Sequence, residues 1–194
     1  MEDAFWQIAG DETLATLVVM ARNTLYLEGS AFDNGEGGVE DVPPSPYDAV
    51  EARELNSSEA DRRAAVPAAY ASGIGNLLAL RRKVILVYPV PEVGWDVPRV
   101  MARRYLADGA VSDLSTSMEV FERRNRATIV ALASIGDHPD LTRIRPDAIL
   151  CDTFVPGRCA ASVAGRPIYA EGDHLSNAGA ELLVPSLLPL IVAR

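Results

Sequence analysis

A histidine with acidic neighbours lies near the end of the chain. His174 follows Asp173 directly, and Glu171 stands three positions before it. A carboxylate that accepts the Nδ1 proton of a histidine fixes its tautomer and stabilises the imidazolium that forms when Nε2 takes a proton from a nucleophile. The spacing permits general-base chemistry of this kind. The alternative, which composition alone favours, is a capped helix with a solvated histidine.

The second histidine also has acidic neighbours, since His138 lies between Asp137 and Asp140. We interpret this segment as a solvated turn, because it connects a helix to the next strand and so lies opposite the reactive loops of an open α/β sheet. Two distant histidines without a Cys-x-x-Cys pair do not form a zinc site. The glycine-rich stretch 33–40 fits no phosphate, dinucleotide or calcium loop. We expect no metal and no cofactor.

Two cysteines, Cys151 and Cys159, flank a Pro-Gly pair that can turn the chain back on itself. They are candidates for a disulfide, with Cα atoms within about 7 Å of each other. A disulfide implies an oxidising compartment. The first residues do not resemble a secretory signal, and the longest nearly apolar stretch, 182–193, is shorter than the roughly 18 residues of a membrane span. We therefore expect no signal and no transmembrane segment in this chain, which conflicts with the compartment.

The composition is that of one globular domain covering residues 1–194. A chain of 194 residues with 48% hydrophobic content can bury one sizeable core. With 18 Lys and Arg against 27 Asp and Glu, the formal charge is -9, so a phosphate backbone is repelled. We therefore expect no nucleic-acid partner.

The first half of the chain contains two strand patterns separated by a helix pattern. Residues 14–21 form a short apolar run, which is typical of a strand buried on both faces of a parallel sheet. Residues 60–80 have helix-like apolar spacing and predict a helix that begins near Pro67. Residues 83–90 are β-branched and apolar, and predict the strongest strand.

The second half continues the alternation. A capped amphipathic pattern predicts a helix within 113–135, and a short apolar run predicts a third strand at 146–151. A last helix begins at Gly179, and Pro185 and Pro189 should kink or shorten it. Strands that alternate with helices predict an α/β fold with a parallel sheet.

Four segments, in this order along most of the chain, resemble the SGNH domain fused to membrane acyltransferases of the acyltransferase 3, O-antigen acetylase type. They are ARNTLYLEG at 21–29, FDNGEGGVE at 32–40, VYPVPEVG at 87–94 and DHLSNAGA at 173–180. The resemblance implies a three-layer α/β/α, flavodoxin-like parallel sheet of the SGNH hydrolase type. It also implies the periplasmic side of a bacterial inner membrane, and O-acyl transfer to, or ester hydrolysis on, cell-envelope polysaccharide. The partners it implies are an acyl-ester or polysaccharide substrate and a membrane acyltransferase domain in the full-length protein.

The chain departs from the family pattern in two places. The Gly-Asp-Ser-His block that supplies the nucleophilic serine has no match, because residues 9–13 read AGDET and precede a strand instead of following one. The last block usually reads Asp-x-x-His, whereas Glu171 stands at its first position, and Glu can serve as the third member of a triad. We therefore expect the carboxy-terminal portion of an SGNH domain, truncated before its serine. The alternative is a non-catalytic module that binds glycans or a partner subunit.

The resemblance gives roles to individual side chains. Asn23 ends the first strand where SGNH hydrolases carry an oxyanion-hole Asn, although an Asn after a strand is commonly a turn residue. Trp95 is a candidate wall of a sugar or acyl pocket, or a core or lid residue. His174 is the expected base, on the same rim as Asn23. Glu171 is its expected partner, because the adjacent Asp173 side chain should diverge.

Overall fold

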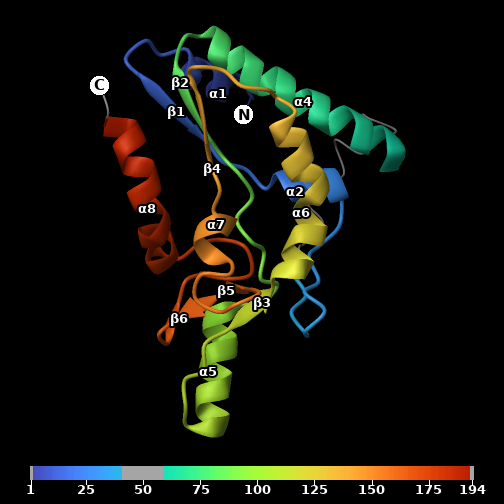
Figure 1. Ribbon diagram of the computed structural model, residues 1–194, viewed down its shortest axis with the longest axis vertical. Helices are drawn as coiled ribbons and strands as arrows, with labels where there is room; N and C mark the ends of the chain where they lie inside the picture. The colour runs from blue at the N-terminus through green and yellow to red at the C-terminus, as the bar shows by residue number, and fades with distance from the viewer. Residues whose placement is uncertain (1, 41–58, 193–194) are drawn as a thin grey trace.

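The centre of the fold is a parallel sheet of three strands, seen in the computed structural model, which describes residues 2–40 and 59–192 (Figure 1). The strands are β1 (Thr16–Val19), β2 (Lys83–Val87) and β4 (Leu141–Ile144), in the order β1-β2-β4. β2 pairs with a parallel neighbour on each side. The expected α/β fold with a parallel sheet is confirmed.

Helices cover both faces of this sheet, because alternate side chains of β2 point to opposite sides. On one face, Val84 and Leu86 belong to a core with residues of α1 (Glu2–Ala9), α4 (Glu59–Ala79) and α6 (Met118–Ala133). On the other face, Ile85 and Val87 pack against Leu187 and Leu190 of α8 (Asn177–Val192). The result is the three-layer α/β/α arrangement (Figure 1).

A second packed region extends beyond the carboxyl ends of the strands, in the lower half of Figure 1. Its elements are α5 (Val97–Asp108), β3 (Ser115–Ser117), α7 (Asp147–Leu150), β5 (Arg158–Ala160), β6 (Ser162–Val163) and β7 (Arg166–Pro167). They surround a core that includes Val93, Val97, Leu150 and Tyr169. This region supports the long loops from which the candidate site is built.

Two predicted elements differ in extent from the structure. β1 was expected to be buried on both faces, but it is an edge strand beside β2 alone, and Val18 is 46% exposed. α4 begins at Glu59, so Pro67 lies inside the helix rather than near its start. A proline already has a helical φ, and the apolar face of α4 packs on the sheet, so tertiary contacts outweigh its local cost.

The third strand was predicted at the wrong place. Residues 146–151 contain the helical turn α7, while the strand is β4, which begins five residues earlier. A short apolar run does not distinguish a strand from a buried helical turn, and here Pro146 is the N-cap and Leu150 is buried. Likewise, α8 is not shortened by its two prolines, because both are exposed and water can hydrate the carbonyls they leave free.

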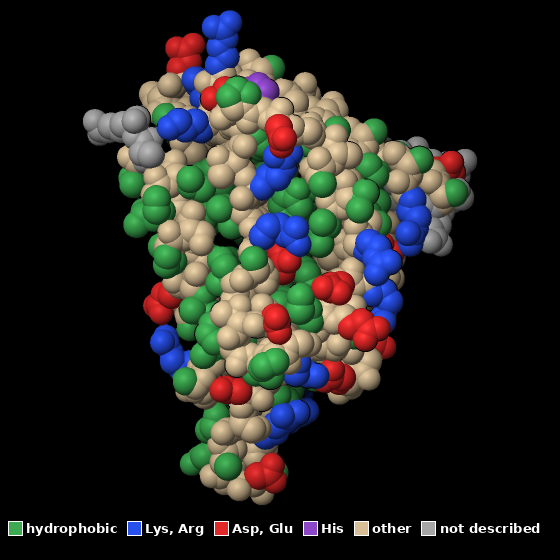
Figure 2. All heavy atoms as spheres, in the orientation of Figure 1, with side chains coloured by type: hydrophobic (Ala, Val, Ile, Leu, Met, Phe, Trp, Pro, Cys, Tyr) green, Lys and Arg blue, Asp and Glu red, His purple; other side chains and the backbone are tan. Residues whose placement is uncertain are grey.

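The surface combines both charge types with one apolar flank. On the face shown in Figure 2, acidic and basic side chains are interspersed rather than gathered by sign. Large apolar side chains remain exposed along α8, namely Val184, Leu188, Ile191 and Val192. In the described part of the chain, the helices are all too short or too polar to cross a membrane.

Candidate active site

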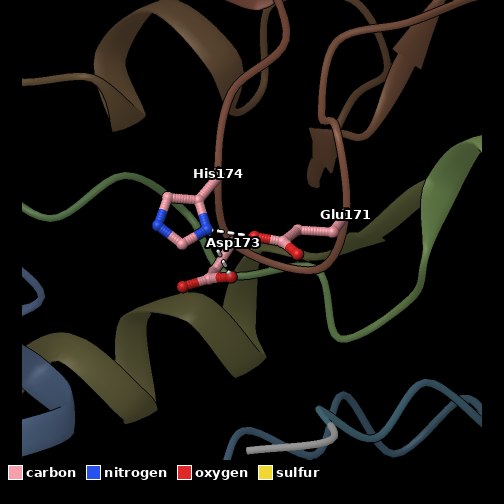
Figure 3. A group of neighbouring side chains, drawn as sticks. All are labelled: Glu171, Asp173 and His174. Atoms are coloured by element: carbon pink, nitrogen blue, oxygen red, sulfur yellow. Dashed lines mark hydrogen bonds and ion pairs between the residues drawn. The ribbon is translucent and has the colours of Figure 1, made fainter.

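A tight loop before α8 brings the predicted histidine and both acidic residues together (Figure 3). Tyr169 and Leu175 form a β-bridge across its base, and the amide of Ala170 donates to the carbonyl of His174 at 2.8 Å. His174 Nδ1 contacts the Glu171 carboxylate, and its distance to Asp173 Oδ1 is 3.2 Å. Both carboxylates therefore face the same ring nitrogen.

The contact with Glu171 decides which nitrogen of His174 is left for chemistry. A carboxylate only accepts hydrogen bonds, so Nδ1 is the donor to Glu171 and carries the proton of this hydrogen bond. Nε2 then holds the lone pair, and Figure 3 shows this nitrogen pointing away from both carboxylates. The His174 side chain is 66% exposed, so a proton donor can reach it. The geometry is that of an oriented general base.

The prediction that the Asp173 side chain diverges from His174 is wrong. One of its oxygens faces His174, and the other lies 2.6 Å from Nε of Arg22. Burial is the largest influence on this carboxyl and raises its pKa, while Arg22 and His174 act in the opposite direction. Arg22 follows β1, and its guanidinium holds the carboxylate inward, which a reading of local spacing does not reveal.

Arg22 is the centre of a charge network that links distant loops. Its guanidinium contacts Glu40 and lies 3.5 Å from Glu92, whose second oxygen is 3.0 Å from Nε of Arg124. The side chains of Glu40, Glu92 and Asp173 are at most 9% exposed. Three nearly buried carboxylates thus share one guanidinium, which ties the loops after β1 and β2 to the histidine loop.

The predicted oxyanion residue lies on the rim that carries His174. A cavity of about 300 Å³, which we name the β1 cavity, is lined by Ala21, Asn23, Pro89 and His174 among others. Asn23 is buried in the first turn of α2 (Asn23–Glu28), and the hydroxyl of Tyr70 donates to its carbonyl at 2.7 Å. Its place beside the base is compatible with an oxyanion role, which remains a prediction.

Trp95 lines a second cavity, which shares Arg22, Asp173 and His174 with the β1 cavity. This space of about 470 Å³, which we name the Trp95 cavity, is also lined by Arg99, Glu171 and His174. A Cβ at Gly38 would lie 2.6 Å from Nε1 of Trp95, so the edge of the indole packs on the glycine-rich loop. Trp95 is half-buried and also packs against the lower core. It therefore combines a packing role with a position in the same cavity lining as His174.

The hydroxyl groups nearest to His174 in the cavity linings or in the sequence are already engaged in hydrogen bonds. Within the described ranges, the linings of the two cavities include no serine. Thr24 lines the β1 cavity, but its hydroxyl donates to Oδ1 of Asn125 at 2.5 Å and is buried. Ser176 is near in sequence, but its hydroxyl donates to the carbonyl of Pro167 at 2.9 Å. The observed group therefore consists of a histidine and two carboxylates that face its Nδ1.

Side-chain atoms of Glu171, Asp173 and His174 all lie within 4.8 Å of one another, so the three could approach a cation. Each is already engaged, because Asp173 is paired with Arg22, and Glu171 contacts Nδ1 of the histidine. The hydrogen bond and the ion pair therefore explain why these three side chains lie together, without a cation.

The cysteines flagged in the sequence are joined. The structure contains a disulfide between Cys151 and Cys159, with Cα atoms 3.8 Å apart, at a β-bridge between the same residues. The other histidine, His138, lies in an exposed turn before β4, where its Nδ1 accepts a hydrogen bond from the Asp140 amide at 3.1 Å. It is absent from the linings of both cavities.

Sequence reasoning missed most of the charge network. Arg22 and Glu92 each follow a strand at its carboxyl end, and that position was a usable signal. Glu40, Arg124 and Asn34 gave no local signal. Asn34 is buried and organises the glycine-rich loop, accepting from the amides of residues 36 and 38 and donating to the carbonyl of Val93 at 2.9 Å.

Comparison with known proteins gives one family and one structural likeness. The family model described as the SGNH domain fused to AT3 domains matches residues 1–189. A solved structure that resembles this chain is the periplasmic domain of a lipopolysaccharide acetyltransferase from Salmonella ser. Paratyphi A, with 16% identity and a TM-score of 0.47. That likeness covers 63% of this chain and 48% of the other, so it spans about half of that structure. No match was found among curated proteins. The chain belongs to the family of SGNH domains that are fused to AT3 domains.

Proposed function

We propose that this chain forms the base-bearing part of an SGNH O-acyltransferase or esterase that acts on cell-envelope polysaccharide. The observation that carries the proposal is the contact of His174 Nδ1 with Glu171, which leaves Nε2 free beside two cavities. The nucleophilic serine is supplied by a segment outside this chain. Membership of the AT3-fused family supports a membrane acyltransferase domain as the partner.

The chemistry follows from the orientation of the base. Nε2 of His174 takes the serine proton as the serine oxygen attacks the acyl carbonyl carbon, and Glu171 stabilises the imidazolium. Asn23 donates a hydrogen bond to the negative oxygen of the tetrahedral intermediate. When the ester C–O bond breaks, His174 returns the proton to the leaving alkoxide. In the second half, His174 deprotonates a sugar hydroxyl for transfer, or a water for hydrolysis, and the serine is regenerated.

The disulfide supports a periplasmic location for this domain. Disulfides persist in oxidising compartments such as the bacterial periplasm and are rare in the cytosol. Cys151 and Cys159 are buried and joined in the structure. We therefore place the domain on the periplasmic side of the inner membrane, where envelope polysaccharide is accessible.

Labelling with a serine-directed fluorophosphonate tests where the nucleophile lies. We expect this chain alone to show no labelling and no turnover of activated acetyl esters. A longer protein that adds the in-frame upstream sequence, with its Gly-Asp-Ser-His block, should be labelled at one serine in that block. Labelling of any serine in this chain, Ser176 included, would show that the nucleophile has been misplaced.

A second candidate function is a non-catalytic module that binds glycans or a partner subunit. The cavity linings favour it in one respect, because in the described ranges they include no serine. The same experiment separates the two functions. A stop codon directly upstream, or a longer protein that transfers no acyl group, would favour the binding module.

A further inference from the structure

Two cavities of different chemical character meet at His174. Both are lined by Arg22, Asp173 and His174, so the Arg22–Asp173 ion pair and the histidine are common to the two cavities. The β1 cavity is otherwise mainly apolar, with the lining side chains of Met20, Ala21, Leu25, Pro89, Val90 and Leu175. The Trp95 cavity presents mainly charged groups and one indole, from Glu40, Trp95, Asp96, Arg99 and Glu171. A base with an apolar space on one side and a polar space on the other can join two unlike ligands.

We propose that the Trp95 cavity is a saccharide subsite selective for neutral, hydroxyl-rich sugars, and that the β1 cavity receives the acyl group. The acyl assignment rests on the proposed function, whereas the sugar assignment does not require catalysis.

The groups in the Trp95 cavity match the chemistry of a sugar. Carboxylates only accept hydrogen bonds and guanidinium groups only donate them, and a sugar hydroxyl does both. Arg99 lies in the first turn of α5 and Asp96 is the N-cap of that helix, where the Arg99 amide donates to Asp96 Oδ1 at 3.1 Å. They stand beside Trp95, whose large apolar ring suits the C–H face of a pyranose. Donors, acceptors and an aromatic surface are therefore present in one wall.

The charge of this cavity favours a neutral ligand. Its lining contains two arginines, Arg22 and Arg99, and four acidic residues, Glu40, Asp96, Glu171 and Asp173. The acidic groups are in excess when His174 is neutral, and the whole chain carries a formal charge of -9. A carboxylate or phosphate on the sugar would be repelled at short range, while hydroxyl groups would not.

The wall that carries Trp95 is held in place before any ligand binds. The amides of Val93 and Gly94 donate to the carbonyl of Gly172 at 2.9 and 3.2 Å, which joins the Trp95 loop to the histidine loop. A Cβ at Gly94 would lie 2.6 Å from the carbonyl oxygen of Gly38, and φ of Gly94 is +73°, so this close packing requires glycine. A subsite built from interlocked loops pays little ordering cost on binding.

Binding of matched sugars to this chain tests the sugar assignment. The probes are methyl α-galactoside and methyl α-rhamnoside, with methyl α-galacturonide as the anionic counterpart of the first. Ligand-observed NMR titrations should detect binding of a neutral glycoside, and the uronide should bind at least about tenfold more weakly. Binding of the uronide at equal or higher affinity, or binding of neither neutral glycoside, would overturn the proposal.

Variants locate the bound sugar. Trp95→Ala and Arg99→Ala should each weaken binding of the neutral glycoside by about tenfold. Arg103→Ala is the matched control, because Arg103 lies one turn further along α5, is exposed, and is absent from the linings of both cavities. Arg99 is exposed, so Arg99→Ala should fold normally, and the test stays valid even if Trp95→Ala does not fold. Unchanged binding in Arg99→Ala would overturn the assignment to this cavity.

The acyl assignment is tested in the longer protein that carries the serine block. Ala21→Phe fills the β1 cavity, so acylation by a butyryl ester should slow about tenfold or more, while glycoside binding stays unchanged. An unchanged acylation rate would overturn the acyl assignment. The outcomes separate the two proposals: if glycosides bind but His174→Ala still transfers acyl groups, the subsite stands and the catalytic function fails. If His174 is essential and glycosides do not bind, the reverse holds.

Discussion

The chain contains two histidines with acidic neighbours, and the structure places them in opposite chemical situations. His174 lies at the carboxyl edge of the sheet, where Nδ1 faces Glu171 and Asp173 and Nε2 is free. His138 lies before β4 at the amino edge, where Nδ1 is occupied by the amide of Asp140. The Oδ2 atom of Asp140 is 3.9 Å from that nitrogen. Similar residue types therefore give opposite tautomers.

The surroundings of the two histidines differ more than their immediate neighbours do. Beside His174, nearly buried carboxylates share Arg22, and two cavities reach the ring. Near His138, Asp137 is fully exposed and its ion pair with Arg143, at 3.3 Å, is open to solvent. Position at the carboxyl edge of a parallel sheet, where loops from several strands converge, distinguishes a candidate site from a surface turn.

Removing each histidine in turn should give the largest contrast. In a longer protein of the kind proposed, with an upstream serine block, His174→Ala should lower acyl transfer by at least about 10³-fold, because members of a triad act as a unit. His138→Ala should leave the rate within about twofold, since a surface substitution changes little. Rates of acyl transfer and circular dichroism spectra of both variants provide the measurement. Comparable losses in the two variants would remove the distinction between the histidines.

The orienting acid should matter less than the base. Glu171→Gln keeps the size of the side chain but can donate a hydrogen bond to Nδ1, which favours the wrong tautomer of His174. We expect a loss of about 10² to 10³-fold in kcat, smaller than for His174→Ala because Asp173 Oδ1 remains 3.2 Å from Nδ1. The pH profile of kcat should change as well, which a purely structural effect would not produce.

Asp140→Asn is the matched control for Glu171→Gln on the other histidine. The group of Asp140 that donates to His138 Nδ1 is the backbone amide, which the substitution leaves unchanged. An Asp140→Asn variant with the same loss as Glu171→Gln would contradict the assigned roles.

Arginine removal should extend the contrast from catalysis to stability. Arg22→Met leaves Glu40, Glu92 and Asp173 nearly buried without their shared guanidinium, and we expect the free energy of unfolding to fall by about 2–3 kcal/mol. Arg143→Met removes an exposed ion pair with Asp137 and a surface hydrogen bond to the carbonyl of Gly136, and should have a much smaller effect. Urea denaturation of both variants measures the difference. Equal losses would show that the Arg22 network is no more stabilising than the surface pair.

Elements with a strong local pattern could be predicted from the sequence, whereas elements that depend on contacts between distant residues could not. β2 and α6 were predictable, because each has a strong local pattern of apolar residues. β4 was missed because Leu-Thr-Arg-Ile has only two apolar residues, and its strand character comes from pairing with β2. The apolar run at 146–151 was too short to distinguish a strand from a helical turn.

The site shows the same limit. Glu171 and His174 are three residues apart, so their contact followed from spacing. The pairing of Asp173 with Arg22 joins the last loop to the loop after β1, and only the topology of the sheet brings them together. The spacing therefore predicted the contact of His174 with Glu171, and missed the guanidinium of Arg22 that draws Asp173 inward.

The smallest expected effect is on the pH dependence of stability, where the two edges of the sheet should differ in sign. Burial raises the pKa of Asp173 above the usual value of about 3.9, so between that value and the raised one the folded protein binds more protons than the unfolded chain. Its contribution to stability is present below about pH 3.9 and is lost as the pH rises through the raised pKa.

At the other edge, hydrogen bonds from the amide and hydroxyl of Thr13 lower the pKa of Asp11. The contribution of Asp11 to stability is therefore present above the usual pKa and is lost as the pH falls through the lowered pKa. Urea denaturation of the wild type, Asp173→Asn and Asp11→Asn across acidic to neutral pH measures both. The stability difference between wild type and Asp173→Asn should fall with rising pH, and that for Asp11→Asn should rise. The same sign for both would mean that Arg22, rather than burial, dominates the Asp173 carboxyl.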